Sequence, residues 1–144
     1  MAKSIWLICK YASPEKYFFG TRHFCFADEW VKNGHEVTIF TSNGSHLTDK
    51  LPQFSGSHMV EDIQGVHTVW LKVLKTTKSS SAVRILSWLH FEWKVLTTSK
   101  RNFNSPDVVI ASSLSILSII SGFLLARYYK ARFILEIRDI WPLS

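Results

Sequence analysis

Two short apolar runs and the segment between them decide the fold: Ser4-Ile5-Trp6-Leu7-Ile8-Cys9, then Thr21 to about Asn33, then Glu36-Val37-Thr38-Ile39-Phe40-Thr41. Continuous apolar runs of this length are typical of strands buried on both faces. Between them, Thr21 can cap a helix, and Gly34 occupies the position where a left-handed C-terminal cap is expected. Apolar residues share one face of this helix: Phe24, Ala27, Trp30 and Val31. The stretch therefore predicts a βαβ unit with a right-handed crossover.

The same alternation continues to the end of the chain. Further strands are predicted at Val66–Leu71, Val108–Ala111 and Arg132–Ile137, with helices at Ala82–Arg101 and from Ser112 or Ser113 to about Lys130. The segment from Ser42 to Gly65 is rich in Gly, Ser, His and Asp, and we expect a loop there with at most a short irregular strand near Met59. Alternating strands and helices predict an α/β fold, a Rossmann-like, mostly parallel sheet with helices on both faces, in one domain over residues 1–144.

The composition is that of one globular domain inside a cell. Of the 144 residues, 47% are apolar and 19% are charged, which is enough apolar material for a single core. Cys9 and Cys25 belong to no metal-binding spacing, so we expect no metal site and a reducing compartment. The first apolar run ends in Lys10 and Tyr11 rather than in a small-residue cleavage site, which predicts a cytoplasmic protein without a signal peptide.

One stretch, Val108 to Ala126, has 19 residues without a charge and is long enough to cross a bilayer. Five serines dilute it, its start resembles a buried strand, bases follow it closely, and another β-rich run comes directly after. We therefore expect a strand and a helix there rather than a membrane span.

The net charge of +6 resides entirely in residues 69–101, which we call the basic segment. It holds one acid, Glu92, and seven bases: Lys72, Lys75, Lys78, Arg84, Lys94, Lys100 and Arg101. Tryptophan and phenylalanine are interleaved with these bases, and this combination suits an anionic membrane surface. On that interpretation the contacts include Lys72, Lys75, Lys78, Trp88 and Trp93. A second interpretation is a helix with a Trp-rich core face and a solvated basic face. Nucleic acid is a third possible partner, which we do not expect.

Polar residues follow several of the predicted strands, at the edge where parallel α/β sheets bind ligands. After the first strand come Gly20 and the helix start Thr21, Arg22 and His23, and after the fourth come Ser112 and Ser113. At the end of the fifth strand are Glu136, Ile137, Arg138 and Asp139. Free amides at two helix starts would suit phosphate or sugar hydroxyls. Taken singly, each group also has an ordinary structural explanation, as a turn glycine, a capping serine or an ion pair.

The first loop excludes two common nucleotide sites. Between Lys10 and Gly20 there is one glycine, so the G-x-G-x-x-G pattern of dinucleotide-binding domains is absent, and so is the Walker pattern. We therefore expect neither an NAD enzyme nor a P-loop NTPase.

The ordered motifs resemble the opening of a GT-B glycosyltransferase, closest to the retaining family 4. They are Pro14-Glu15, Gly20-Thr21-Arg22-His23, Asn33-Gly34-His35-Glu36-Val37-Thr38-Ile39-Phe40-Thr41, Pro106-Asp107-Val108-Val109 and Glu136-Ile137-Arg138-Asp139-Ile140-Trp141-Pro142. The last block is similar to the subgroup that builds bacterial O-antigens and capsules, including the fucosamine-type transferases.

The resemblance implies an acceptor-binding domain that acts on a polyprenyl-diphosphate-linked sugar at the inner face of the cytoplasmic membrane. It implies that Gly20 lies beside the donor diphosphate. Many relatives have a histidine after the fifth strand, where this chain has Arg138 and Asp139, so Asp139 is the expected catalytic-site residue, to bind a sugar hydroxyl or orient the acceptor. No cofactor is implied, because the nucleotide-sugar is a co-substrate.

Two departures from the family pattern matter. Relatives commonly carry two glycines in the first loop, whereas here Phe18-Phe19 precede a single one. The nucleotide-sugar site of the family, with its Glu-x7-Glu signature, lies in a C-terminal domain that these 144 residues do not include. We therefore expect a half-enzyme that does not turn over alone, unless a separate chain supplies that domain. The alternative is a non-catalytic Rossmann-like module that binds an anionic membrane surface or a partner protein.

Overall fold

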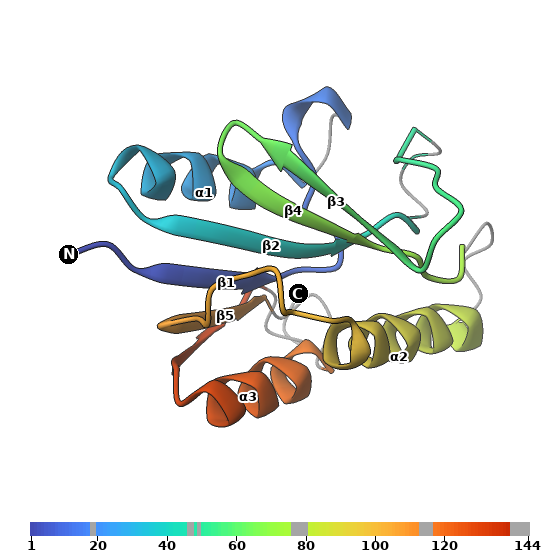
Figure 1. Ribbon diagram of the computed structural model, residues 1–144. Helices are drawn as coiled ribbons and strands as arrows, with labels where there is room; N and C mark the ends of the chain where they lie inside the picture. Colours follow the sequence, from blue (N-terminus) through green and yellow to red (C-terminus); the bar gives the residue numbers. More distant parts are fainter. Residues whose placement is uncertain (18–19, 46–47, 49, 76–80, 113–116, 139–144) are drawn as a thin grey trace.

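The computed structural model describes residues 1–17, 20–45, 48, 50–75, 81–112 and 117–138. A six-stranded sheet of order β3-β4-β2-β1-β5-β6 forms its centre (Figure 1). The strands are β1 (Ser4–Ile8), β2 (Glu36–Ser42), β3 (His58–Ile63), β4 (Val66–Leu71), β5 (Val108–Ser112) and β6 (Arg132–Glu136). The helices are α1 (Arg22–Lys32), α2 (Ser81–Thr97) and α3 (Ser118–Tyr129), with a 3-10 turn η1 (Glu15–Tyr17).

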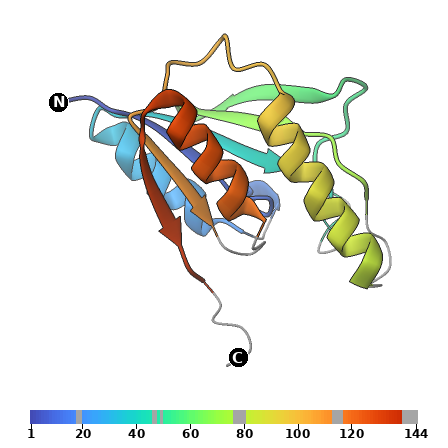
Figure 2. The same ribbon diagram turned by 90° about the horizontal axis from the view of Figure 1, so that it is seen from below.

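All strand pairs except β3–β4 are parallel. Helix α1 covers one face of the sheet, and α2 and α3 lie side by side on the other (Figures 1 and 2). From β1 the chain moves outward to β2 and β4, then crosses back to β5 on the other side of β1. The strand order therefore reverses between β1 and β5, which is where such sheets bind ligands. The α/β, Rossmann-like prediction is confirmed.

Helix α1 ends as its sequence predicts. Gly34 adopts φ +82°, and its amide donates to Val31 O at 2.9 Å, while the amide of His35 donates to Trp30 O at 3.0 Å. This pair of bonds is a Schellman cap. At the other end, Thr21 occupies the N-cap position, but its side chain makes no capping hydrogen bond.

Three predicted boundaries were wrong. His58–Ile63 is a regular strand paired antiparallel with β4 through a turn at Gln64 and Gly65, whereas we expected a loop with at most a short irregular strand near Met59. Ser112 is the last residue of β5 and does not begin α3, which starts at Ser118. Helix α2 ends at Thr97 instead of Arg101. In the part of the chain that the structure describes, no helix is long and apolar enough to cross a membrane.

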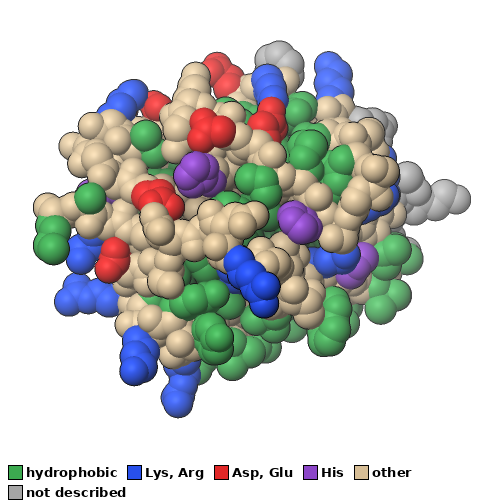
Figure 3. All heavy atoms as spheres, in the orientation of Figure 1, with side chains coloured by type: hydrophobic (Ala, Val, Ile, Leu, Met, Phe, Trp, Pro, Cys, Tyr) green, Lys and Arg blue, Asp and Glu red, His purple; other side chains and the backbone are tan. Residues whose placement is uncertain are grey.

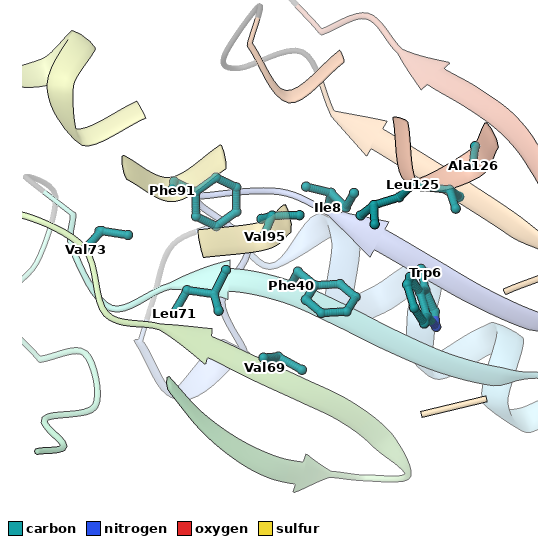
Figure 4. Packing of buried hydrophobic residues seen from close by; sticks show 11 residues of the cluster. Trp6, Ile8, Phe40, Val69, Leu71, Val73, Phe91, Val95, Leu125 and Ala126 are labelled. Atoms are coloured by element: carbon teal, nitrogen blue, oxygen red, sulfur yellow. The ribbon is translucent and has the colours of Figure 1, made fainter. Parts of the chain in front are cut away.

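Side chains from β1 alternate between two cores. Ile5, Leu7 and Cys9 pack toward α1. Trp6 and Ile8 point to the other face, where they meet Phe40, Phe91 and Val95 beneath α2 and α3 (Figure 4). Every residue of β1 is buried, which confirms the prediction of a strand covered on both faces.

Helix α3 packs closely on β5 and β6 at Gly122, and this contact yields a stability prediction. A Cβ at Gly122 would lie 2.8 Å from Ala111 Cβ and 2.9 Å from Phe133 Cε2. Alanine raises intrinsic helix stability by about 1 kcal/mol, but overpacking costs about 1–3 kcal/mol. Because both contacts are under 3.0 Å, we place the overpacking cost in the upper part of this range, about 2–3 kcal/mol. We therefore expect Gly122→Ala to lower the free energy of unfolding by about 1–2 kcal/mol in urea titration. Gly56→Ala is the control, because a Cβ there meets its nearest atom at 3.4 Å. An equal or higher stability for Gly122→Ala would contradict this packing.

Candidate functional site

Gly20 closes the loop that follows β1. Its φ is +63°, and a Cβ there would lie 2.0 Å from Tyr11 O, a contact that no side chain tolerates. Its carbonyl accepts a hydrogen bond from the amide of Ser13 at 3.3 Å. The space that glycine leaves open is thus occupied by the chain's own backbone, and Gly20 folds the loop back onto the end of β1.

Four side chains meet at the carboxyl ends of β5 and β6, and we call them the carboxyl-edge cluster: Arg22, His23, Ser112 and Glu136. Glu136 ends β6, and its two oxygens pair with successive residues at the start of α1. Arg22 Nη2 lies 3.0 Å from Oε1, and His23 Nε2 lies 2.7 Å from Oε2. Residues 113 positions apart in the sequence are therefore joined across the sheet edge.

The burial of His23 determines its protonation state. The side chain is 1% exposed, and burial lowers the pKa of His23 against the opposing effect of Glu136. A neutral imidazole beside a carboxylate carries its proton on Nε2, so that Nε2–H donates to Glu136. Burial raises the pKa of Glu136, but the hydrogen bond and charge of His23, together with Arg22, outweigh it and hold that pKa below its usual value. Nδ1 of His23 is then a buried acceptor without a hydrogen-bond partner among the described residues.

Ser112 lies next to this pair. It is the register neighbour of Glu136 across β5 and β6 and is 1% exposed. Its hydroxyl is close to Glu136 and Cys9, but makes no hydrogen bond of ordinary geometry within the described residues. Burial raises the pKa of the Cys9 thiol to about 11, so Cys9 is a protonated core residue and no nucleophile.

The remaining predicted site residues are less defined. Arg138 follows β6 by two residues and is exposed, so it lies at the same edge as the carboxyl-edge cluster. Ser113, Asp139 and Lys78 lie outside the described residues. The cluster thus brings three predicted site residues, Arg22, His23 and Ser112, around the carboxylate of Glu136. Arg22 is its solvent-facing member, with 54% side-chain exposure.

A second polar group lies beneath α2, at the end of β1. Lys10 is 3% exposed, and its Nζ donates to Gly44 O at 3.2 Å and to the Tyr11 hydroxyl at 3.5 Å. That hydroxyl also accepts from Trp88 Nε1 at 3.2 Å. Glu92 of α2 is 7% exposed and accepts hydrogen bonds from Ser118, at 2.8 Å, and from Ser121 of α3.

Burial shifts both of these charged groups toward neutrality. It lowers the pKa of Lys10 to about 8, although the charge of Glu92 opposes the shift. Burial raises the pKa of Glu92, while the hydrogen bonds from Ser121 and Ser118 and the charge of Lys10 work against it. Glu92 thereby holds the first turn of α3 against α2, directly beside the point where strand order reverses.

Sequence reasoning missed Lys10 and Glu92, although each carries a signal, and it placed Glu136 at the end of the fifth strand without giving it a role. Lys10 continues the alternation of Trp6 and Ile8 and so points toward α2 and α3. Glu92 is the one acid of the basic segment and adjoins Phe91 on its buried side. Glu136 ends the β6 strand, where a side chain turned to the edge is well placed for a site.

The residues predicted for a membrane surface separate into different environments. Lys72 Nζ donates to Phe54 O at 3.2 Å, and Lys75 Nζ donates to Gln53 Oε1 at 2.9 Å, so both hold the loop before β3. Trp88 is half-buried and donates a hydrogen bond to the Tyr11 hydroxyl, whereas Trp93 is 66% exposed. The interpretation with a Trp-rich core face is wrong, because the outward side of α2 carries Trp93.

The described residues contain no group of three or more His, Cys, Asp or Glu side chains that could hold a metal ion. The chain matches no protein-family model and no curated protein. The geometry at the carboxyl edge offers a guanidinium, that of Arg22, which a carboxylate holds in place and whose exposed side can meet an anion or a hydroxyl group.

The closure of the first loop predicts that two glycines differ in their tolerance of alanine. Gly20→Ala adds both a left-handed φ and an overlap with Tyr11 O, whereas Gly34→Ala adds only the φ strain, since nothing lies within 4 Å of its Cβ. We expect a loss of about 1 kcal/mol for Gly34→Ala and at least about 2 kcal/mol for Gly20→Ala in urea unfolding. Equal losses would show that Gly20 does not contact the loop backbone.

Lys10 predicts a specific pH dependence of stability. Folding lowers its pKa from 10.5 to about 8, so between these values the unfolded chain binds more protons than the folded chain. The free energy of unfolding therefore gains a contribution from Lys10 as pH rises from 8 to 10.5, by as much as about 3 kcal/mol. Lys10→Met should remove this contribution, as measured by urea unfolding across that range.

The exposed Lys3 provides the control for this experiment. Lys3→Met should leave the pH profile unchanged, because Lys3 is exposed in the folded chain. Other titrating groups, such as Lys100 and Cys9, contribute equally to both variants and to the wild type, so they cancel in the comparison. Parallel profiles for the wild type and Lys10→Met would mean that Lys10 is solvated in the folded chain.

Proposed function

We propose that this chain is the acceptor-binding domain of a retaining GT-B glycosyltransferase that moves a sugar from a nucleotide-sugar to a lipid-linked sugar acceptor in bacterial surface polysaccharide synthesis. The observation that carries the proposal is the carboxyl-edge cluster. Two of the motifs behind the resemblance, Gly20-Thr21-Arg22-His23 and Glu136-Ile137-Arg138-Asp139, meet in this cluster through the bonds of Glu136. The cluster lies at the sheet edge where α/β domains bind ligands.

In this proposal the cluster holds the diphosphate and the first sugar of the acceptor. Arg22 is half-exposed and carries the positive charge, and Glu136 fixes its direction. Neutral His23 donates to Glu136 and keeps that carboxylate oriented without adding a second charge. Arg138 adds a further cation at the same edge, and Asp139 binds a sugar hydroxyl or orients the acceptor. Neither carboxylate is assigned as a nucleophile.

The partners follow from the same proposal. The nucleotide-sugar is a co-substrate held mainly by a second Rossmann-like domain, in the same or a separate chain, and no further cofactor takes part. The acceptor is membrane-embedded, so the domain works in the cytoplasm at the inner face of the membrane. The alternative function is a non-catalytic module for an anionic membrane surface or partner protein, which needs no ligand at the carboxyl edge.

Binding of an acceptor analogue separates the two functions. The probe is a short-chain polyprenyl diphosphate carrying N-acetylglucosamine, titrated into the 144-residue chain by isothermal calorimetry. We expect Arg22→Ala to weaken binding at least about tenfold, because it removes charge-assisted hydrogen bonds to the diphosphate. Arg132→Ala is the matched control, since Arg132 is exposed at the opposite end of β6.

Two results would contradict the acceptor site. One is equal affinity for the probe and for inorganic pyrophosphate, which would indicate a simple anion site. The other is an equal loss in Arg22→Ala and Arg132→Ala, which would indicate general electrostatic attraction. Thermal unfolding of both variants checks that the fold is retained.

A further inference from the structure

Helix α2 turns its larger apolar stripe away from the sheet. Phe91 and Val95 pack into the core, while a second stripe at helical spacing faces solvent. Its members and their exposed fractions are Leu86 54%, Leu89 49%, Trp93 66% and Leu96 38%. A soluble helix ordinarily buries the face that carries most of its large apolar side chains, so this stripe indicates a contact that the domain does not satisfy by itself.

Helix α3 carries a matching stripe. Ile120, Phe123, Leu124 and Tyr128 are 47–79% exposed and follow the i, i+3, i+4, i+8 spacing of one helix face. The two helices lie side by side on the same face of the sheet (Figure 2). A groove of about 370 Å³ joins the stripes, lined by Leu96, Lys100, Leu124 and Tyr128 among others. We call the eight stripe residues together the α2–α3 surface.

Charge around this surface has one sign. Residues 81–130 contain six bases, namely Arg84, Lys94, Lys100, Arg101, Arg127 and Lys130, and two acids. Glu92 is buried against Ser118 and Ser121, and Asp107 belongs to the segment that enters β5 at the amino edge of the sheet. Arg127 lies within the α3 stripe itself, at i+7 from Ile120. Figure 3 shows hydrophobic side chains gathered along the lower side of the molecule, with Lys and Arg at the margins.

The exposed apolar stripes and the bases around them distinguish between the possible binding partners of the α2–α3 surface. Lys100 is occupied, because its Nζ donates to the carbonyls of Val95, Leu96 and Thr98. A second copy would still place the other five bases opposite the same five, and like charges across an interface disfavour it. Nucleic acid would satisfy the bases, but not the Leu and Ile side chains between them. An anionic bilayer satisfies both, because apolar side chains enter the acyl boundary while Lys and Arg meet the lipid phosphates.

We propose that the α2–α3 surface docks on an anionic lipid bilayer with both helices lying flat in the headgroup region. The α2–α3 surface differs from the membrane contacts predicted for the basic segment. It includes residues of α3, and it leaves out Lys72 and Lys75, which hold the loop at residues 53–54, and Trp88, which is turned inward. The helices run antiparallel to the strands they follow, so the strands also lie parallel to the membrane plane. The carboxyl-edge cluster then opens sideways, parallel to the membrane surface, and not toward it. The proposal deepens the membrane-surface alternative given under the proposed function by naming the surface, and it does not rest on the acceptor site, since it requires no acceptor.

Co-sedimentation with vesicles tests the docking. The full chain is mixed with vesicles of phosphatidylcholine containing 30% phosphatidylglycerol, or with phosphatidylcholine alone. We expect binding to the anionic vesicles and at least about fivefold weaker binding to the neutral ones. Trp93→Ser and Phe123→Ser should each weaken binding about tenfold, and Arg127→Glu at least about fivefold.

Control variants stand on the other side of the molecule. Phe26→Ser alters an exposed aromatic residue of α1, 41% exposed on the opposite face of the sheet, and Lys3→Glu reverses a charge at the amino edge. Both should leave vesicle binding within about twofold. Circular dichroism confirms that each variant is folded, and all altered side chains are exposed.

Three outcomes would overturn the proposal. These are full vesicle binding by Trp93→Ser and Phe123→Ser, equal binding to neutral and anionic vesicles, and concentration-dependent dimerisation that Trp93→Ser abolishes in a chain that binds no vesicles. No substrate is present in this assay, so its failure leaves the acceptor titration unaffected, and failure of that titration leaves the docking result unaffected.

Discussion

The alternation of side chains along β1 is the constraint on which the rest of the structure depends. β1 is paired on both edges and covered on both faces, so every residue in it must serve one core or the other. Ile5 and Leu7 build the core under α1, while Trp6 and Ile8 build the core under α2 and α3. The next residue on that second side is Lys10, and the same alternation carries its charge beneath α2. The surrounding hydroxyl, carbonyl and carboxylate groups are the compensation that a buried ammonium requires.

The carboxyl-edge cluster and the α2–α3 surface occupy different parts of this framework. The cluster lies where β5 and β6 end and α1 begins, whereas the surface lies across the far side of the sheet. Glu92 belongs to neither group: it lies on α2, accepts hydrogen bonds from the first turn of α3 and acts on Lys10 just after β1. The cluster and the surface share no residue, so each can be altered by separate substitutions.

Much of the fold was predictable from the sequence, because buried parallel strands and glycine caps have local signatures. The βαβ unit and the cap at Gly34 follow directly from such signals. Strand β3 was predicted only as a short irregular strand within a loop, because an edge strand exposed on one side holds polar residues such as His58, Glu61 and Asp62, which also suit a loop. Ser112 was assigned to a helix start because serine is as common at caps as at a strand end, and only pairing with β6 distinguishes the two.

The candidate site was less predictable for a related reason. Local patterns identified Arg22 and His23 at a helix start and Glu136 at a strand end, but not the bonds between them, since Glu136 is distant in sequence. Which stripe of α2 faces the core was also beyond local reasoning. The sequence favours the stripe of Leu86, Leu89, Trp93 and Leu96 as the core face, because it has the larger apolar content. In the structure the opposite side of the helix faces the core, where Phe91 and Val95 pack with Trp6 and Phe40.

The bonds from Glu92 to Ser118 and Ser121 have a consequence for how the two helices meet a partner. They hold α2 and α3 in fixed registration, so their outward stripes form one rigid plate. Amphipathic segments that fold upon binding lose conformational entropy at that moment, and they depend on lipid-packing defects in which to fold. A preformed plate loses little entropy. If the surface docks on a bilayer as proposed, we expect its affinity to depend on lipid charge and buried apolar area more than on membrane curvature.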